Sequence, residues 1–205
     1  CGAVHSHSGE MKAAYRQIKA NVQLFSSLKV DSIISNAGGC GAVLKDYARW
    51  AEDHNPLLVE KAGKVASQVE DISEFLARIG YRVPSARLEK RLGYDEPCHL
   101  VHGQKISAAP RKILQSLPGI TWTEIPGADQ CCGGAGTYNI TQYDLSMRIL
   151  EKKMQSIASA GAEVVATGNP VCLLQLRYGA KRFSIPVEFR HPAEILAELY
   201  RRETD

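Results

Sequence analysis

The 205-residue sequence lacks any long hydrophobic run and any block of charge of one sign. No apolar stretch approaches the roughly 18 residues that a membrane-spanning helix needs, so we expect contact with a membrane to be peripheral at most. Basic and acidic residues are interspersed and the net charge is only +3, which leaves no basic arm for nucleic acid. Hydrophobic residues make up 44% of the chain and charged residues 23%, an ordinary globular composition with one or two cores.

Cysteine is also sparse, and its distribution excludes one class of protein. The six cysteines do not form the short, regular framework of a disulfide-stapled secreted domain. They fit a reducing compartment and metal chemistry better. We therefore expect a cytoplasmic protein, with any membrane association confined to the inner face of the cell membrane.

The most unusual stretch spans residues 129–139, where two adjacent cysteines precede three glycines (Cys131, Cys132, Gly133, Gly134 and Gly136). Glycine weakens both helices and strands, so this stretch predicts a loop. Adjacent cysteines on a regular strand point to opposite faces, and a turn at glycine is needed to aim both thiols at one object. The glycines also leave backbone N–H groups uncovered before a helix expected from about residue 141. Such a setting favours an anionic group, including an iron–sulfur cluster bound by thiolates.

Two single cysteines, Cys98 and Cys172, accompany this pair. Each follows a short apolar or mixed run that can form a strand, so three loops can converge at the edge where open α/β sheets bind ligands. Four thiolates from three loops can bind either zinc or an iron–sulfur cluster, and their spacing leaves both open. We expect His99 and His102 to form hydrogen bonds around such a site rather than to bind the metal.

The sequence also contains an internal repeat. Cys1 precedes a glycine and a helix, as Cys132 does, and a later strand leads to Cys40 as another leads to Cys172. The two offsets are 131 and 132 residues. Counterparts of the remaining cysteines would lie before Cys1, so we expect the chain to be part of a longer protein. Cys1 and Cys40 would then form an incomplete second site, although packing as a small hydrophobic residue is a competing interpretation for Cys40.

Apolar periodicity predicts the order of helices and strands. Helices are expected over residues 10–28, 42–52, 56–80, 109–117, 141–159, 172–179 and 192–200. Strands are expected over residues 31–35, 121–125, 163–167 and 185–189. This alternation predicts an α/β fold with a largely parallel sheet. The charged residues 82–93 are typical of a linker, which divides the chain into domains of residues 1–81 and 94–205.

Three stretches carry a resemblance to a known family, and they are residues 97–105, 131–139 and 168–176. With the order of the cysteines, they resemble the cysteine-rich CCG-domain iron–sulfur proteins. The resemblance runs from residue 1 to about residue 200. It is strongest to the C-terminal part of the glycolate oxidase iron–sulfur subunit, and it extends to the lactate-utilisation iron–sulfur protein and to the CCG-domain component of heterodisulfide reductase. It implies two repeated CCG-type layers of mostly parallel sheet flanked by helices, with the first repeat incomplete.

The resemblance also implies a function in electron transfer, as a non-catalytic subunit of an oxidoreductase complex. A flavin-containing partner, which alone would carry FAD, would oxidise a 2-hydroxy acid such as glycolate, and this chain would relay electrons to a quinone-type acceptor. Other iron–sulfur regions would lie upstream in the full-length protein. The implied cofactor is an iron–sulfur cluster of the four-iron, four-sulfur (4Fe-4S) type, held by Cys98, Cys131, Cys132 and Cys172. The residues expected around it are His99, His102, Gly133, Gly134, Gly136 and Asn169.

Three alternatives stay open. In the heterodisulfide reductase pattern each repeat ends in Cys-x-x-Cys, but Asn169 and Ala37 stand where the first of these cysteines would be. The loss of a fifth thiolate favours electron relay over disulfide reduction, since four thiolates suit one ordinary cluster. A lactate-utilisation subunit is the second alternative. A zinc-binding scaffold, in which four thiolates hold one ion, is the third.

Overall fold

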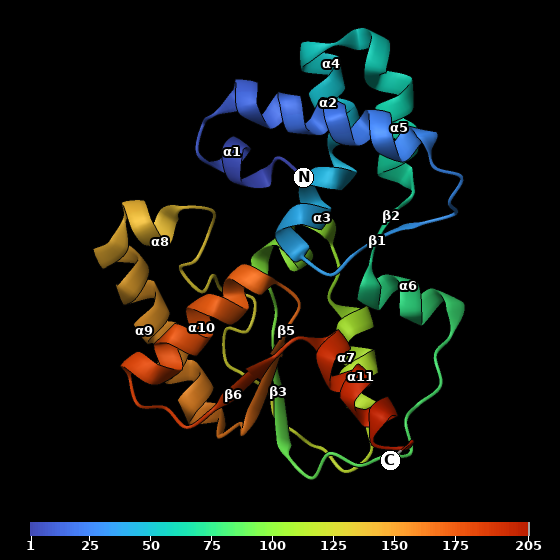
Figure 1. The fold of residues 1–205 in the computed structure, drawn as a ribbon. Coiled ribbons are helices and arrows are strands. Elements are labelled where there is room, and N and C mark those ends of the chain that lie inside the picture. The colour runs from blue at the N-terminus through green and yellow to red at the C-terminus, as the bar shows by residue number, and fades with distance from the viewer. Residues whose placement is uncertain (205) are drawn as a thin grey trace. The chain divides into compact units, whose positions relative to one another are not determined.

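The computed structural model describes residues 1–204 and divides into two compact units, residues 1–72 and those from Ser73 onward (Figure 1). Short parallel strands occur among helices in both units. This arrangement confirms the predicted α/β fold. No helix in the described part of the chain is long and apolar enough to cross a membrane.

The second unit is built on a four-stranded parallel sheet with the strand order β4-β3-β5-β6. The central strands β3 and β5 align Leu92 with Val164 and Asp95 with Thr167. All four residues of β5 are buried, as expected for a strand that is covered on both faces. The strands are β3 (Arg91–Asp95), β4 (Thr121–Trp122), β5 (Val164–Thr167) and β6 (Glu188–Arg190).

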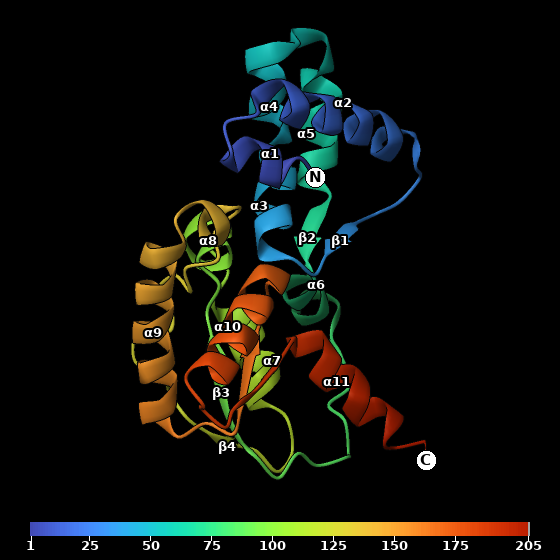
Figure 2. The same ribbon diagram turned by 60° about the vertical axis from the view of Figure 1, so that its left-hand side comes forward.

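Helices cover both faces of this sheet (Figure 2). One face packs against α9 (Tyr143–Ala160) and α10 (Pro170–Arg182), and the other against α7 (Ala108–Gln115) and α11 (Pro192–Arg201). Successive strand residues point to opposite faces, which explains why the neighbours Val164 and Val165 belong to different cores. The other helical segments after residue 71 are α6 (Ile72–Ile79), the π-helical turn η2 (His99–Gln104) and α8 (Tyr138–Thr141).

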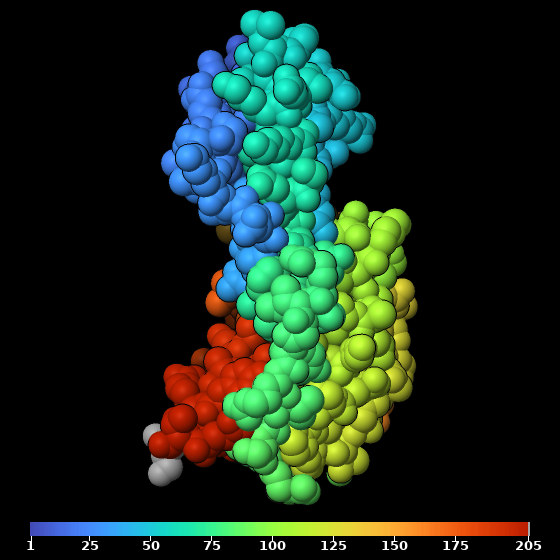
Figure 3. Space-filling model, turned by 90° about the vertical axis from the view of Figure 1, so that its right-hand side faces the viewer, coloured from blue at the N-terminus to red at the C-terminus, as the bar shows by residue number. Residues whose placement is uncertain are grey.

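The segment between α6 and β3 lies along the end of the chain. Figure 3 shows it (green) beside α11 (red) on the molecular surface. Arg82 donates a hydrogen bond of 3.1 Å to the carboxylate of Glu203, just beyond α11. The hydroxyl of Ser85 donates to the same carboxylate at 3.0 Å. These contacts fix a segment that has neither helix nor strand of its own between α6 and β3.

The first unit is mainly helical, with one pair of parallel strands, β1 (Ile33–Ser35) and β2 (Val69–Asp71). Its core includes the buried ring of Tyr47 and apolar residues of α2 and α5. The helices are α1 (Ala3–His7), α2 (Met11–Ser27), α3 (Gly38–Lys45), α4 (Tyr47–His54), η1 (Pro56–Leu58) and α5 (Val59–Ser67).

The structure corrects the single helix predicted over residues 56–80. That range contains η1, α5, β2 and α6 instead. β2 pairs with β1, which lies far earlier in the chain, and the pairing satisfies backbone N–H and C=O groups of both strands. Apolar periodicity within the range cannot reveal this strand, because pairing depends on a partner that is distant in sequence.

Most of the other predicted elements are confirmed with small shifts at their ends. The exceptions are one helix and two strands. The helix over residues 42–52 is two helices that meet at Asp46, the strand over 121–125 is shortened to β4, and the strand over 185–189 overlaps β6 only at residues 188 and 189. The predicted linker over residues 82–93 overlaps the start of β3 at Arg91. The division into domains of residues 1–81 and 94–205 stays a prediction.

Candidate metal centre

Four cysteines meet beyond the carboxyl ends of the parallel strands in the second unit. Cys98 follows β3, Cys131 and Cys132 lie in the loop after β4, and Cys172 follows β5. Parallel strands end at one edge of their sheet, so the segments that leave them come together there. α10 begins at Pro170, whose fixed φ suits the first helical position, and this start places Cys172 in the first turn.

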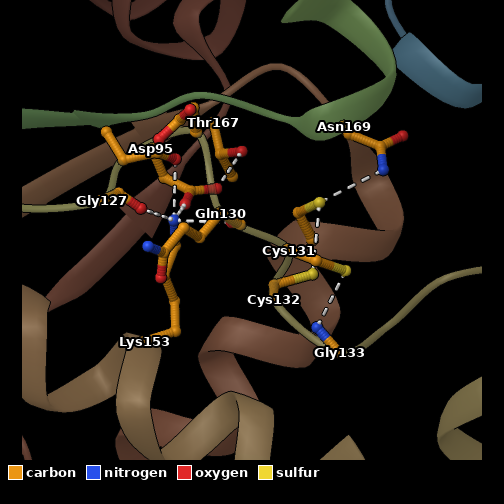
Figure 4. Close-up of polar contacts among 12 residues, drawn as sticks. Asp95, Gly127, Gln130, Cys131, Cys132, Gly133, Lys153, Thr167 and Asn169 are labelled. Atoms are coloured by element: carbon orange, nitrogen blue, oxygen red, sulfur yellow. Dashed lines mark hydrogen bonds and ion pairs between the residues drawn. The ribbon is translucent and has the colours of Figure 1, made fainter. Parts of the chain in front are cut away.

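The four sulfur atoms form a continuous series of close contacts. The thiol of Cys132 donates to Cys172 Sγ at 3.4 Å. Cys131 interacts electrostatically with the thiols of both Cys132 and Cys98, which lower its pKa. Figure 4 shows Cys131 and Cys132 beside each other in this group. The structure therefore brings all four predicted cysteines together, and their role as metal ligands stays a prediction.

Two N–H donors contact these sulfurs. Gly133 donates its backbone N–H to Cys131 Sγ at 3.3 Å, and the side-chain amide of Asn169 donates to Cys172 Sγ at 3.3 Å (Figure 4). Gly133 has a φ of +86°, and a Cβ at this position would lie 2.7 Å from the carbonyl oxygen of Ser146. The position therefore requires glycine. N–H donors of this kind stabilise negative charge on sulfur and help to tune a bound metal centre.

Negative charge in the sulfur group is concentrated at Cys131. Hydrogen bonds from the Cys132 and Cys98 thiols lower the pKa of Cys131 to about 2, with further contributions from the Gly133 N–H and the Lys153 charge. The same hydrogen bonds, together with burial, raise the pKa values of Cys98 and Cys132. Once Cys131 is ionised, the Cys98 and Cys132 thiols are therefore hard to ionise unless a positive charge balances the added negative charge. A metal core supplies such compensation when it replaces the protons.

The sulfur group is buried on one side and open on the other. Cys132 and Cys172 are each only 4% exposed, whereas Cys98 and Cys131 are half-buried. A cavity of about 470 Å³ reaches Cys98 and Cys131 and is also lined by His102, Asp129, Gln130, Ile149, Lys152 and Lys153. The open side of the group therefore faces a polar, partly cationic recess.

The donor set suits a thiolate-bound metal centre, but the sulfurs lie close together. Within residues 1–204, no three His, Cys, Asp or Glu side chains are spaced to hold one metal ion. The 3.4 Å separation of the Cys132 and Cys172 sulfurs is below the ~3.8 Å that two thiolates reach on one tetrahedral zinc ion with Zn–S bonds of ~2.3 Å. Metal binding therefore requires the sulfurs to move apart.

Helix α9 fastens the cysteine loop on both sides, a feature that sequence patterns did not predict. Lys153 donates to the backbone carbonyl oxygens of Gly127, Ala128 and Gln130, before the two cysteines. Ser146 donates to the carbonyl oxygen of Gly133 at 2.8 Å, after them. Both side chains are buried on the apolar face of α9. A lysine in the apolar stripe of a predicted helix was the available signal, because lysine is almost never fully buried without a partner.

The other residues predicted around the site occupy several positions. His99 Nδ1 lies 3.7 Å from Cys98 Sγ, and His102 Nε2 lies 3.3 Å from the carbonyl oxygen of Asp129. Within residues 1–204, Gly133 alone of the three glycines donates its N–H to a cysteine sulfur. A Cβ on Gly134 would contact Val171 and Gln175 of α10, and Gly136 adopts a left-handed φ of +54°. These two glycines thus serve close packing and loop geometry.

The first unit contains a second, smaller sulfur group. The Cys1 thiol lies 3.1 Å from Cys40 Sγ, and the backbone N–H of Ala3 donates to Cys1 Sγ at 3.5 Å. The hydroxyl of Tyr47 donates to the Cys1 carbonyl oxygen at 3.0 Å and accepts a hydrogen bond from Asn21. Burial raises the pKa of this tyrosine, so the hydroxyl remains protonated and available as a donor. Two cysteines come together here, as predicted, and their assignment as part of a metal site stays a prediction.

Equivalent positions in the two units share their backbone geometry. Gly2, after the first cysteine, has a φ of +88°, and Gly133 has a φ of +86°. A Cβ on Gly2 would lie 3.1 Å from the carbonyl oxygen of Ala14, and one on Gly133 would meet that of Ser146. Ala14 and Ser146 lie 132 positions apart, the same offset as the later cysteine of each repeat. The repeat inferred from the sequence therefore extends to how Gly2 packs on α2 and Gly133 packs on α9.

A comparison with protein families identifies this arrangement. The model of the CCG family, described as a cysteine-rich domain, matches residues 1–45 and 92–177. The matched stretches cover more than half of the chain and contain all six cysteines. The chain belongs to the CCG family of cysteine-rich domains. The predicted family is thereby confirmed.

Curated relatives of this CCG chain include iron–sulfur subunits. It is 36% identical to the probable glycolate oxidase iron-sulfur subunit of Bacillus subtilis, over 100% of this chain and 47% of the relative. It is 31% identical to the glycolate oxidase iron-sulfur subunit of Escherichia coli, over 99% of this chain and 49% of the relative. Lactate utilization protein A of Lysinibacillus sphaericus is 27% identical over 96% of this chain and 85% of its own length. The chain thus spans about half the length of the two glycolate oxidase subunits.

Proposed function

We propose that this CCG chain is an electron-transfer subunit that holds an iron–sulfur cluster in a complex that oxidises a 2-hydroxy acid. The convergence of four cysteine sulfurs from three segments carries the proposal, because such a donor set suits cluster binding. The names of its relatives, which are iron–sulfur subunits of glycolate oxidase, give independent support.

The chain's own residues have separate tasks in this proposal. Cys98, Cys131, Cys132 and Cys172 hold the cluster, for which the 4Fe-4S type is the first candidate. The Gly133 N–H and the Asn169 amide stabilise negative charge on the sulfurs. When bound, such a cluster accepts and releases one electron at a time.

The position of the cavity suggests where electrons enter or leave. Cys98 and Cys131 line an open recess, whereas Cys132 and Cys172 are buried. A partner or acceptor therefore has its closest approach through the recess. Lys152, which is exposed at its rim, gives that side a positive charge suited to an acidic partner surface.

The remaining parts of the proposal concern the complex. A flavin-containing partner, which carries the FAD, oxidises the 2-hydroxy acid, with glycolate as the first candidate. Electrons pass through this chain to a quinone-type acceptor, and upstream iron–sulfur regions of a longer protein take part. The complex is cytoplasmic, with peripheral contact at the inner face of the cell membrane, and it does not bind nucleic acid.

Asn169 favours electron relay over disulfide reduction. It occupies the position that would supply a fifth cysteine, and its amide donates to Cys172 Sγ at 3.3 Å. An amide donor stabilises a neighbouring thiolate but does not replace a thiolate ligand. The site therefore offers four sulfur ligands rather than five.

Anaerobic purification tests the proposal directly. We expect brown protein with a visible absorption that bleaches with dithionite, together with iron and acid-labile sulfide in equal amounts. Colourless protein with one zinc ion per chain would support the scaffold alternative and end the relay proposal. Reduction of a disulfide substrate by the iron-loaded protein would instead support the heterodisulfide reductase alternative.

A further inference from the structure

Lys153 is a buried cation that contacts the cysteine loop and not the cysteines themselves. Its side chain is 2% exposed, and its Nζ atom lies 2.6 Å from Asp95 Oδ1 (Figure 4). It also lies 2.7 Å from the carbonyl oxygen of Ala128, 2.9 Å from that of Gln130 and 3.0 Å from that of Gly127. A neutral amine has only two N–H groups and an ammonium has three. Four oxygen atoms around the nitrogen therefore indicate the charged form.

The packing of α9 does not by itself require this charge. Lys153 lies on the apolar face of the helix with Leu150 and Ile157, where a methionine of similar length would pack without burying an ion. Burial of an ammonium group is costly unless it is paired and hydrogen-bonded. Asp95 supplies the opposite charge and is itself held by a 2.9 Å hydrogen bond from Thr167. We therefore attribute this buried ion pair to the loop carbonyl oxygens that Lys153 contacts.

Those contacts fix the segment directly before the paired cysteines. Residues 127–130 have no helix or strand hydrogen bonding of their own, and three of their carbonyl oxygens point to one nitrogen atom. The carbonyl oxygen of Ala128 also accepts from the backbone N–H of Glu96, next to Asp95. The loop is thus tied both to α9 and to the end of β3, the strand that leads to Cys98.

The two buried charges act on the sulfur group with opposite signs. Lys153 lines the same cavity as Cys98 and Cys131, and its Nζ atom contacts the carbonyl oxygen of Gln130, the residue before Cys131. The Asp95 carboxylate is the buried partner of Lys153, with Oδ1 2.6 Å from Nζ. A positive charge close to the sulfurs therefore stabilises added negative charge, and a negative charge opposes it.

We propose that Lys153 is a positioning residue with an electrostatic role: it holds residues 127–130 so that Cys131 and Cys132 face Cys98 and Cys172, and its charge favours the reduced state of the bound cluster. The inference rests on the proposed function. Reduction of the cluster by a partner adds one electron and one negative charge, without a bond being made or broken. Lys153 stabilises this charge, and Asp95 opposes it.

Redox titration of iron- and sulfide-reconstituted full chain tests the electrostatic part. We expect Lys153→Met to lower the ratio of reduced to oxidised cluster about tenfold at the wild-type midpoint, equivalent to about 59 mV for one electron. Lys153→Arg keeps the charge and should restore most of this ratio. Asp95→Asn removes the opposing charge and should raise the ratio. Arg148→Met removes an exposed positive charge of the same helix that does not line the cavity; it is the matched control and should change the ratio little.

The positioning part has its own measurements. Iron and sulfide content per chain should fall in Lys153→Met, and amide hydrogen exchange over residues 127–133 should rise, while Arg148→Met leaves both unchanged. If Lys153→Met leaves too little cluster for a redox titration, the electrostatic part is decided by Asp95→Asn, which should raise the ratio of reduced to oxidised cluster. Unchanged ratios in Lys153→Met and Asp95→Asn, or shifts of the same sign, would overturn that part.

If the proposed function is wrong, the experiments give a result that differs from the one expected when only the role of Lys153 is wrong. Wild-type chain that takes up no iron overturns the electron-relay proposal and the electrostatic role with it. The positioning role is then decided by hydrogen exchange in the metal-free chain. Equal exchange over residues 127–133 in Lys153→Met and Arg148→Met would overturn that role as well.

Discussion

Among individual residues, Cys131 is set apart from the other three cysteines of its site by its charge. Its pKa is lowered to about 2 by hydrogen bonds from Cys132 and Cys98, while the pKa values of those two donors are raised. Metals bind thiolates rather than thiols. If the four cysteines bind a metal core as proposed, Cys131 would be the first ligand that the site offers, and the other thiols would lose their protons as the core replaces them.

The two sulfur groups should differ in their effect on metal content. We expect Cys132→Ser to lower bound iron and acid-labile sulfide several-fold, because it removes a buried member of the four-sulfur series. Cys40→Ser serves as the control, since Cys40 contacts only Cys1 among the cysteine sulfurs within residues 1–204, and it should change the metal content little. Colorimetric iron and sulfide assays measure both. Equal losses would show that the site is assigned to the wrong cysteines.

Gly133 should be among the least tolerant positions of the cysteine loop. Its φ of +86° disfavours any side chain, and a Cβ would lie 2.7 Å from the carbonyl oxygen of Ser146. We expect Gly133→Ala to destabilise the chain by at least about 1–2 kcal/mol, the cost of a left-handed conformation without glycine. Gly63→Ala, in the interior of α5 with no atom within 4 Å of the new Cβ, should instead stabilise by about 0.5–1 kcal/mol. Thermal or denaturant unfolding compares the two.

At the scale of secondary-structure elements, α9 does more than cover one face of the sheet. Its apolar residues Leu150, Met154 and Ile157 belong to a core, and Ser146 and Lys153 on the same face bind the cysteine loop. A single helix thus joins hydrophobic packing to the placement of the site. Movement of this helix would displace the loop on both sides of the two cysteines.

Ser146 gives a way to test this link. Its hydroxyl donates to the carbonyl oxygen of Gly133 and accepts a 3.1 Å hydrogen bond from Gln175, so Ser146→Ala leaves both partners unsatisfied in a buried place. We expect a loss of about 1–3 kcal/mol in unfolding free energy, together with lower iron content. Ser159→Ala, at an exposed position of the same helix, should stay within about 0.5 kcal/mol. If Ser146→Ala lost stability but kept its full iron content, the contact between α9 and the cysteine loop would not be needed for metal binding.

At the scale of the whole molecule, the two units have separate cores and unequal sulfur groups. Four cysteines meet in the second unit and two in the first. A ligand that binds only the folded state stabilises the unit that contains its site by mass action. Metal binding should therefore affect the two units differently.

Removal of bound iron by a chelator should expose this difference. We expect the second unit to lose stability, by about 2.7 kcal/mol where the metal had been present at a hundred times its dissociation constant. Hydrogen exchange should rise over residues 94–103 and 128–137 and stay unchanged over residues 1–45. Thermal unfolding with and without metal gives the size of the effect. A uniform rise along the chain, or none, would contradict the placement of the metal in the second unit.

The sequence by itself determined the class of the fold, the family and the group of candidate cysteines. Alternating apolar patterns predicted helices such as α2, α9 and α11, because helical periodicity is a local property of the chain. The glycines beside Cys132 predicted a turn, because the left-handed conformation at Gly133 is a local preference of glycine. Repeated spacing predicted that Cys1 and Cys40 would come together.

Only the tertiary structure decided features that depend on distant partners. The strand β2 exists because β1 supplies hydrogen bonds from far earlier in the chain, so no pattern within residues 56–80 could predict it. The order in which the four sulfurs contact one another depends on how three segments leave the sheet. The role of Lys153 depends on Asp95 and three carbonyl oxygens that the fold brings to one nitrogen atom. Side-chain type shows that a buried lysine needs partners, but only the folded chain brings those partners to it.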